Sequence, residues 1–258
     1  MCVWQNTLGV AEAVLQALGK RYEETGEPNN LTILFGGGPG DWGSRGLSNL
    51  AKVKDDGTPP MLTRTIGSHY GQVPGVAELA LNETVEAWTL PMGSVSRMVR
   101  AQSTHSPGHI TTVGIGTYVD PDLEGGCANE KAKNSPFGKH LISKLEIGGE
   151  MNLMYRALPI DVAIIRGTTA DLNGNITMEH ESLLVDQRIT ATAAKNSGGI
   201  VIAQVKRIAA TGSFSPRDVE VPGALVDAIV VVDEKDHDTL HPMSFQQTAN
   251  PAFTGELR

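Results

Sequence analysis

The sequence predicts an α/β protein with an open, mainly parallel sheet that carries helices on both faces. Three apolar runs rich in β-branched residues, at positions 161–166, 200–205 and 228–232, have the composition of strands buried on both faces. Stretches with apolar side chains at helical spacing separate such runs along the chain. Strands that alternate with helices are typical of a parallel sheet covered by helices, so we expect a Rossmann-like architecture.

The first half of the chain alternates most clearly between helix and strand. Residues 9–22 place apolar side chains on one helical face, and residues 31–35 form a short apolar strand. The polar, proline-rich residues 52–60 are expected to form an exposed loop. The elements expected next are a strand, a short helix, a strand and a longer helix, at residues 63–68, 76–81, 86–90 and 95–106.

Three local signals stand out in the second half of the chain. Residues 131–150 are hydrophilic and are expected to form a surface excursion of a single domain that spans residues 1–258. Residues 171–175 contain the Asn-Gly pair of a tight hairpin turn, which supplies positive φ angles. Residues 182–194 are expected to form a helix.

Composition and charge exclude several classes of protein. No apolar run approaches the roughly 20 residues needed to span a bilayer, so no membrane protein is expected. The net charge of -8 argues against a nucleic-acid surface, because neutralising phosphates requires clustered Lys and Arg. The two cysteines, Cys2 and Cys127, cannot form a disulfide framework, and no secretory signal is visible, so a cytoplasmic protein is expected.

Motifs for nucleotide binding, hydrolysis and metal binding are absent or weak. The glycine-rich turn at residues 36–43 matches G-x-G-x-x-G, but no clear helix or suitably spaced acidic residue follows, so a dinucleotide site is not expected. Both G-x-S-x-G and H-E-x-x-H are missing. We expect a solvated loop and no metal site at four residues that could in principle bind a metal ion: Asp236, His237, Asp238 and His241.

Two other stretches contain residues that could take part in catalysis or ligand binding. Glu179 and Glu181 are two residues apart, which places both carboxylates on one face of a strand, although nothing brings them to a pocket. Residues 110–113 form a β-rich run that continues into closely spaced glycines. This pattern predicts a buried strand that opens into a loop at its carboxyl end, where ligands bind in open α/β sheets. The glycines would leave N–H groups free to face an anion or a developing oxyanion.

Several ordered segments resemble the propionate/acetate branch of the family I CoA-transferases. GIGTYVDP at residues 114–121, with a Gly-Gly pair behind it, is similar to the GIGTFVDP…GG stretch in the α half of that family. GSHYG at residues 67–71 resembles the branch's GGHYG, and Arg45-Gly46-Leu47 resembles its RGL. The resemblance runs from about residue 8 to the last residues and implies a CoA-transferase α domain.

The resemblance implies the transfer of CoA between a short-chain acyl-CoA and a carboxylic acid, with CoA as a substrate and no further cofactor. In the family, a glutamate attacks the acyl-CoA and forms an acyl-glutamyl anhydride and then a glutamyl-CoA thioester. That glutamate lies in the β half in an E-[NT]-G context, and this sequence has no such motif. We therefore expect no catalytic residue in this chain, a β half as its partner, and an apolar face that makes the chain oligomeric.

The resemblance also indicates which residues of an α half would line the site. These substrate-binding candidates are Pro91, Met92, Gly93, Gly114, Gly116, Thr117 and Tyr118. Two positions depart from the family pattern. Residues 4–7 replace a glycine-rich loop, and Met92 replaces a glutamine that contacts the acid carboxylate, to which a thioether cannot donate a hydrogen bond.

Two alternative functions stay open. The two departures favour a non-catalytic remnant or interaction subunit that binds CoA or acyl-CoA weakly. An isomerase or hydrolase that acts on a small phosphorylated ligand rests on fold analogy alone, because related doubly wound folds host such activities.

Overall fold

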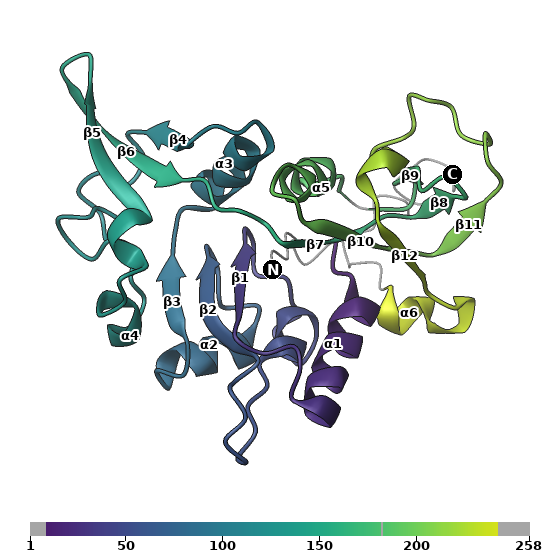
Figure 1. The fold of residues 1–258 in the computed structure, drawn as a ribbon, viewed down its shortest axis with the longest axis horizontal. Coiled ribbons are helices and arrows are strands. Elements are labelled where there is room, and N and C mark those ends of the chain that lie inside the picture. Colours follow the sequence, from purple (N-terminus) through teal and green to yellow (C-terminus); the bar gives the residue numbers. More distant parts are fainter. Residues whose placement is uncertain (1–8, 182, 242–258) are drawn as a thin grey trace, which may run out of the picture.

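The computed structural model describes residues 9–181 and 183–241 of the 258-residue chain. Its centre holds two three-stranded parallel sheets, with the strand orders β1-β2-β3 and β12-β10-β7. Figure 1 shows helices on both sides of these strands, which confirms the α/β class. No helix in the described ranges is long and apolar enough to cross a membrane.

The first parallel sheet comes from the amino-terminal part of the chain. Its strands are β1 (Leu31–Phe35), β2 (Leu62–Gly67) and β3 (Glu86–Thr89). The helical segments that accompany it are α1 (Glu12–Thr25), the 3-10 helix η1 (Gly46–Leu50) and α2 (Pro74–Leu81). Helix α1 ends because Gly26 adopts a left-handed conformation, with φ of 77°, and donates its N–H to the Tyr22 carbonyl at 2.7 Å.

Two strands of the second parallel sheet are largely buried, but the third, β12, is exposed or half-buried, so the prediction of a buried strand at residues 228–232 is wrong. The strands of this sheet are β7 (Val162–Arg166), β10 (Ile200–Val205) and β12 (Ala228–Val231). Alternate side chains of β7 enter different cores: Ala163 and Ile165 pack in the cluster that contains α5 (Gln187–Asn196), whereas Ile164 packs with α1. This two-sided burial explains the nearly continuous apolar run in the sequence.

Helices and short 3-10 turns complete this half of the molecule. Helix α3 (Met92–Ser103) packs beside α5, and both lie on the same side of β7 and β10 in Figure 1. The remaining short helical segments after β10 are η3 (Gly223–Leu225), η4 (Glu234–Asp236) and α6 (His237–Leu240).

Strand β4 (Gly108–Thr111) corrects one prediction. The sequence predicts a buried strand at residues 110–113 within the parallel sheet, but β4 pairs antiparallel with β6 (Glu150–Arg156) at the edge of a separate sheet. Ile110 is 43% exposed, because only one face of this edge strand packs on the protein. The loop after β4 therefore does not lie at the carboxyl end of a central parallel strand.

Residues 131–150, the predicted surface excursion, contain regular structure. They contribute the strand β5 (Ile142–Ile147), which pairs with β6, and parts of helix α4 (Glu130–Lys133) and the 3-10 helix η2 (Gly138–His140). The hairpin turns at two glycines with φ of 62° and 84° and projects at the upper left of Figure 1. Its base is anchored by Leu141 and Ile142, which are both buried.

The fourth sheet contains the predicted tight hairpin. Its strands are β8 (Thr169–Asp171), β9 (Ile176–Thr177) and β11 (Arg207–Ala209). The turn between β8 and β9 has Gly174 at φ of 83°, as the Asn-Gly pair predicts. Helix α5 begins only at Gln187, later than expected, and the predicted first residue of that helix, Ser182, lies outside the described residues, as do residues 4–7.

Candidate functional site

Two of the predicted site segments lie side by side although they are far apart in the sequence. Gly126, at the end of the loop that carries the candidates Gly114 to Tyr118, donates its N–H to the Tyr118 carbonyl at 2.9 Å. The Gly126 carbonyl in turn accepts a hydrogen bond from the Thr89 N–H at 2.8 Å, just before Pro91. These two bonds fasten the loop to the junction between β3 and α3. The structure thus brings the Pro91–Gly93 and Gly114–Tyr118 candidates together, with residues 113–126 as one loop, termed here the 113–126 loop.

Tyr155 of β6 provides a second tie between the same segments. Its hydroxyl donates to the Val113 carbonyl at 2.8 Å, and its side chain is fully buried. Burial raises the pKa of the Tyr155 phenol, and the polar side chain of Ser94, in the first turn of α3, opposes that rise. One side chain therefore joins the start of the 113–126 loop to the start of α3. Sequence reasoning missed both Tyr155 and Ser94.

Internal hydrogen bonds determine the shape of the 113–126 loop. Gly114 and Gly116 have φ of 106° and 71°, which side-chain-bearing residues rarely adopt. The Gly116 N–H donates to the Asp120 carboxylate at 2.9 Å, and Lys144 of β5 approaches the same carboxylate at 2.8 Å. These contacts lower the pKa of Asp120 to about 2, with the Gly116 N–H as the main cause. The expectation that the glycine N–H groups are free for an oxyanion is therefore wrong for Gly116.

The amino-terminal end of α3 offers other N–H groups. Ser94 and Val95 both donate to the Pro91 carbonyl, whereas the N–H groups of Met92 and Gly93 precede the first bond of the helix and point from its positive end. A Cβ placed on Gly93 or on Gly116 would meet no described atom within 4 Å, so both glycines face open space.

The candidate residues form an open wall rather than a closed pocket. Met92 is 57% exposed and Tyr118 is 47% exposed, and Thr117 between the glycine turn and Tyr118 is exposed as well. Such apolar groups on the surface are typical of a face that meets a partner. The arrangement can supply backbone donors and an apolar surface, but the wall itself contains no nucleophile or titratable acid beyond the phenol of Tyr118.

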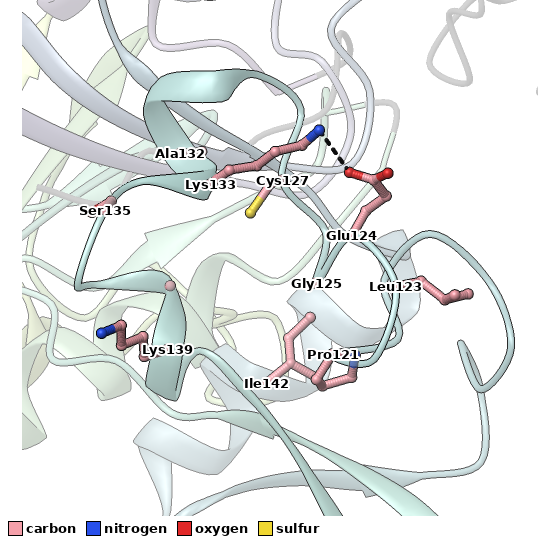
Figure 2. Close-up of a pocket in the computed structure, with 11 residues that line it drawn as sticks. Pro121, Leu123, Glu124, Gly125, Cys127, Ala132, Lys133, Ser135, Lys139 and Ile142 are labelled. Atoms are coloured by element: carbon pink, nitrogen blue, oxygen red, sulfur yellow. Dashed lines mark ion pairs between the residues drawn. The ribbon is translucent and has the colours of Figure 1, made fainter.

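A cavity that the sequence did not predict lies behind the 113–126 loop. Its volume is about 430 Å³, and it opens between residues 121–127, which comprise the end of that loop and Cys127, and residues 132–142 (Figure 2). The cavity borders Cys127, whose side chain points inward, and the lysines Lys133 and Lys139.

The two glutamates of the predicted shared strand face have separate environments. Glu181 is buried, with Oε2 2.9 Å from Arg166 Nε and Oε1 2.9 Å from His241 Nε2. Glu179 is partly exposed and pairs with Arg207 at 2.8 Å. Neither residue lies in a strand, because β9 ends at Thr177, so the prediction of a common face is wrong.

The structure also corrects the prediction for His241, the last described residue. His241 was expected in a solvated loop, but it is fully buried and contacts both Glu181 and the Gln204 side chain. Burial lowers the pKa of His241 to about 4, which keeps its ring neutral at pH 7. Within residues 9–181 and 183–241, no group of three His, Cys, Asp or Glu side chains is arranged to hold a metal ion.

The fold is that of an α/β protein with parallel sheets, and comparison with known proteins identifies the family. A family model described as coenzyme A transferase matches residues 20–232. The chain is 39% identical over 261 residues to the caffeate CoA-transferase of Acetobacterium woodii, covering 98% of this chain and 47% of that protein. It is 37% identical over 233 residues to the acetate CoA-transferase YdiF of Escherichia coli K12, covering 90% and 42%. The chain therefore belongs to the coenzyme A transferase family, as the motifs predict.

A solved structure supports the same assignment. The acyl-CoA transferase YdiF from Escherichia coli O157:H7, in a thioester complex with CoA, superposes with a TM-score of 0.82 at 35% identity. The match covers 90% of this chain and 44% of that one. The chain thus spans about half the length of the curated relatives it matches.

Proposed function

We propose that this chain is the α half of a family I CoA-transferase, which moves CoA between a short-chain acyl-CoA and a carboxylic acid. The observation that carries the proposal is the open wall formed by the 113–126 loop and the start of α3. Met92, Gly93, Gly116 and Tyr118 all face outward there, so a second half can complete the site. The substrate-binding candidates Pro91 to Gly93, Gly114 and Gly116 to Tyr118 include no carboxylate that could act as the nucleophile, which the second half would supply.

In the proposed reaction, a glutamate of the β half attacks the thioester carbonyl of the acyl-CoA. The C–S bond breaks, CoA leaves as a thiolate, and an acyl-glutamyl anhydride forms. The thiolate then attacks the glutamyl carbonyl, releases the first carboxylic acid and leaves a glutamyl-CoA thioester. A second carboxylate reverses the two steps and departs as the new acyl-CoA.

The wall would contribute binding and charge stabilisation to these steps. The N–H groups of Met92 and Gly93 at the positive end of α3 suit a carboxylate or an oxyanion. The exposed Met92 thioether would contact the apolar body of the acyl group rather than its carboxylate. Gly114, Thr117 and Tyr118 would line the opposite side.

Two comparisons support the division into halves and the bound intermediate. The acetate CoA-transferase subunit alpha of Escherichia coli K12 is 24% identical to this chain over 193 residues, which cover 73% of this chain and 77% of that protein. The YdiF transferase has been solved as a thioester complex with CoA. The partner of this chain is accordingly a β half, with an acyl-CoA and a carboxylic acid as substrates.

The test is CoA transfer from propionyl-CoA to acetate, measured with this chain alone and with a β half added. We expect activity only after reconstitution, and a CoA adduct on a glutamate of the β half by mass spectrometry. The variant Gly93→Val should lower the reconstituted rate without changing the unfolding midpoint, because its side chain enters open space in this chain. Activity of this chain alone would refute the proposal, and no activity in either case would favour a non-catalytic remnant.

A second measurement addresses the exposed wall. The apolar groups on it should make the isolated chain self-associate, and light scattering should report a dimer or larger species. Addition of a β half should replace this self-association with a mixed complex. A stable monomer that does not bind a β half would contradict the proposed role.

A further inference from the structure

Asp120 is a buried carboxylate that takes no part in the proposed bond-breaking steps. It is only 3% exposed, although residues 115–118 of the same loop are exposed. Burying a carboxylate is unfavourable unless donors replace its lost hydration. The Gly116 and Asp122 N–H groups donate to it at 2.9 and 3.1 Å, and the Lys144 ammonium lies 2.8 Å away. Donors from two separate segments of the chain therefore converge on this side chain.

The backbone of Asp120 adds further bonds within the 113–126 loop. Its N–H donates to the Thr117 carbonyl at 2.9 Å. Its carbonyl accepts from the Leu123 N–H at 2.9 Å and from the Gly125 N–H at 3.0 Å. Asp120 thus holds residues that precede it and residues that follow it, and the candidates at residues 116–118 belong to the preceding part.

Lys144 connects Asp120 to a different element of the fold, because it belongs to β5, which pairs with β6. The Oδ1 atom of Asp120 lies 2.8 Å from the Lys144 ammonium, and Oδ2 accepts from the Gly116 N–H. The carboxylate therefore fixes the position of the glycine turn relative to β5. Asp122 also pairs with Lys144, but its side chain is 73% exposed.

We propose that Asp120 is a positioning residue of the CoA-transfer site, where it fixes residues 116–118 in the conformation that faces the second half. The proposal rests on the proposed function, because the role of these residues in the site belongs to that function. Gly116 adopts a φ of 71°, and glycine has access to both signs of φ, so this turn needs a tie to keep one conformation. Misplacing a group that contacts the reacting atoms by about 1 Å can lower a rate about 100-fold.

Two aspartate variants test the tie in the isolated chain. Asp120→Asn and Asp122→Asn each remove one carboxylate that pairs with Lys144, but of the two only Asp120 accepts the Gly116 N–H. We expect Asp120→Asn to speed amide hydrogen exchange in the 113–126 loop about tenfold, because an amide has a single oxygen to share among the three donors. Asp122→Asn should change the exchange rate less than about twofold. Equal exchange in the two variants would overturn the proposal.

The second measurement is CoA transfer from propionyl-CoA to acetate in the presence of a β half. We expect Asp120→Asn to lower kcat about 10- to 100-fold with less than about a threefold change in the KM for propionyl-CoA, because a misplaced wall loses interactions made in the transition state. The rate is expressed per chain pair that forms the CoA adduct, so a partly unfolded sample does not imitate the loss. Asp122→Asn should keep kcat within about twofold.

Two lysine variants provide an independent comparison. Lys144→Arg keeps the positive charge beside Asp120 and should keep kcat within about twofold, whereas Lys144→Gln removes the charge and should lower kcat about five- to tenfold. Equal kcat in the two lysine variants would overturn the proposal, and this comparison holds even if Asp120→Asn does not fold. An unchanged kcat in Asp120→Asn, beside an active wild-type mixture, would overturn this proposal alone. Absence of transfer in the wild-type mixture would refute the proposed function and, with it, the role of Asp120.

Discussion

Glu179 and Glu181 stand two residues apart, yet replacing each by glutamine should have very different effects on stability. Arg166 and Glu181 form an ion pair at 2.9 Å, with the side chains only 2% and 1% exposed. The ion pair between Arg207 and Glu179 is 2.8 Å long, but its side chains are 50% and 41% exposed. The two pairs have similar lengths and differ chiefly in burial.

The expected magnitudes follow from that difference. Glu181→Gln leaves the Arg166 guanidinium buried without a counter-charge, and breaking a buried pair from one side costs about 3–5 kcal/mol. The amide keeps the shape of the side chain and one acceptor, so we expect about 3 kcal/mol, or roughly 6–12 °C in the unfolding midpoint. Glu179→Gln removes an exposed ion pair and should cost less than about 1 kcal/mol.

Urea unfolding, followed by circular dichroism and by tryptophan fluorescence, measures both variants. The double variant Arg166→Met/Glu181→Leu should recover much of the loss, because it removes both charges together. Equal destabilisation by the two single variants, within about 1 kcal/mol, would refute the assignment of Glu181 to a buried ion pair. A double variant no more stable than Glu181→Gln would show that the loss is not due to an unpaired charge.

Four further changes test the 113–126 loop, the buried His241, the hydrogen bonds of Asn129 and the recognition of the carboxylic acid. Tyr155→Phe should cost about 1–2 kcal/mol in urea unfolding and speed amide hydrogen exchange in the 113–126 loop, because it leaves the Val113 carbonyl without its donor; unchanged exchange would contradict this tie. Between pH 6.5 and 4 the unfolded chain binds a proton at His241 that the folded chain does not, since burial lowers the folded pKa from 6.5 to about 4. Stability should therefore fall by up to roughly 3 kcal/mol as the pH drops through this window, and His241→Gln should flatten the pH profile. Asn129→Ala should lower the free energy of unfolding by about 2–4 kcal/mol in thermal unfolding. The buried Asn129 side chain donates to the Ala80 and Val85 carbonyls and accepts from the N–H groups of Ala87 and Ala132. A loss below about 0.5 kcal/mol would be inconsistent with these bonds. Met92→Gln should lower the KM of the reconstituted enzyme for the acid by several-fold, because an amide can donate to a carboxylate, while Met92→Leu should leave it near the starting value.

Local sequence patterns predict most of the central elements correctly. The strands β7 and β10 are visible as short apolar runs, because burial on both faces requires apolar side chains at nearly every position, whereas β12 has the same apolar composition but is exposed or half-buried. The Asn-Gly pair predicts the turn between β8 and β9, because few other residues adopt its positive φ angles. The family is also visible in the sequence, since its motifs are short and contiguous.

The candidate site was only partly predictable. The motifs identify Pro91 to Gly93 and Gly114 to Tyr118, but the bonds that hold these segments together come from Gly126 and Tyr155. The strand at residues 110–113 was assigned to the wrong sheet, because a β-branched run has the same local pattern in an antiparallel edge strand and in a central parallel one.

What the sequence by itself determined is the α/β class and the family, both of which depend on contiguous patterns. Only the tertiary structure decided that the Gly116 N–H binds Asp120, that Glu181 is buried against Arg166 and His241, and that a cavity lies beside Cys127. The physical reason is that these properties depend on partners distant in the chain. Burial, charge pairing and enclosed volume arise only when such segments pack together, and no local periodicity records which of them will meet.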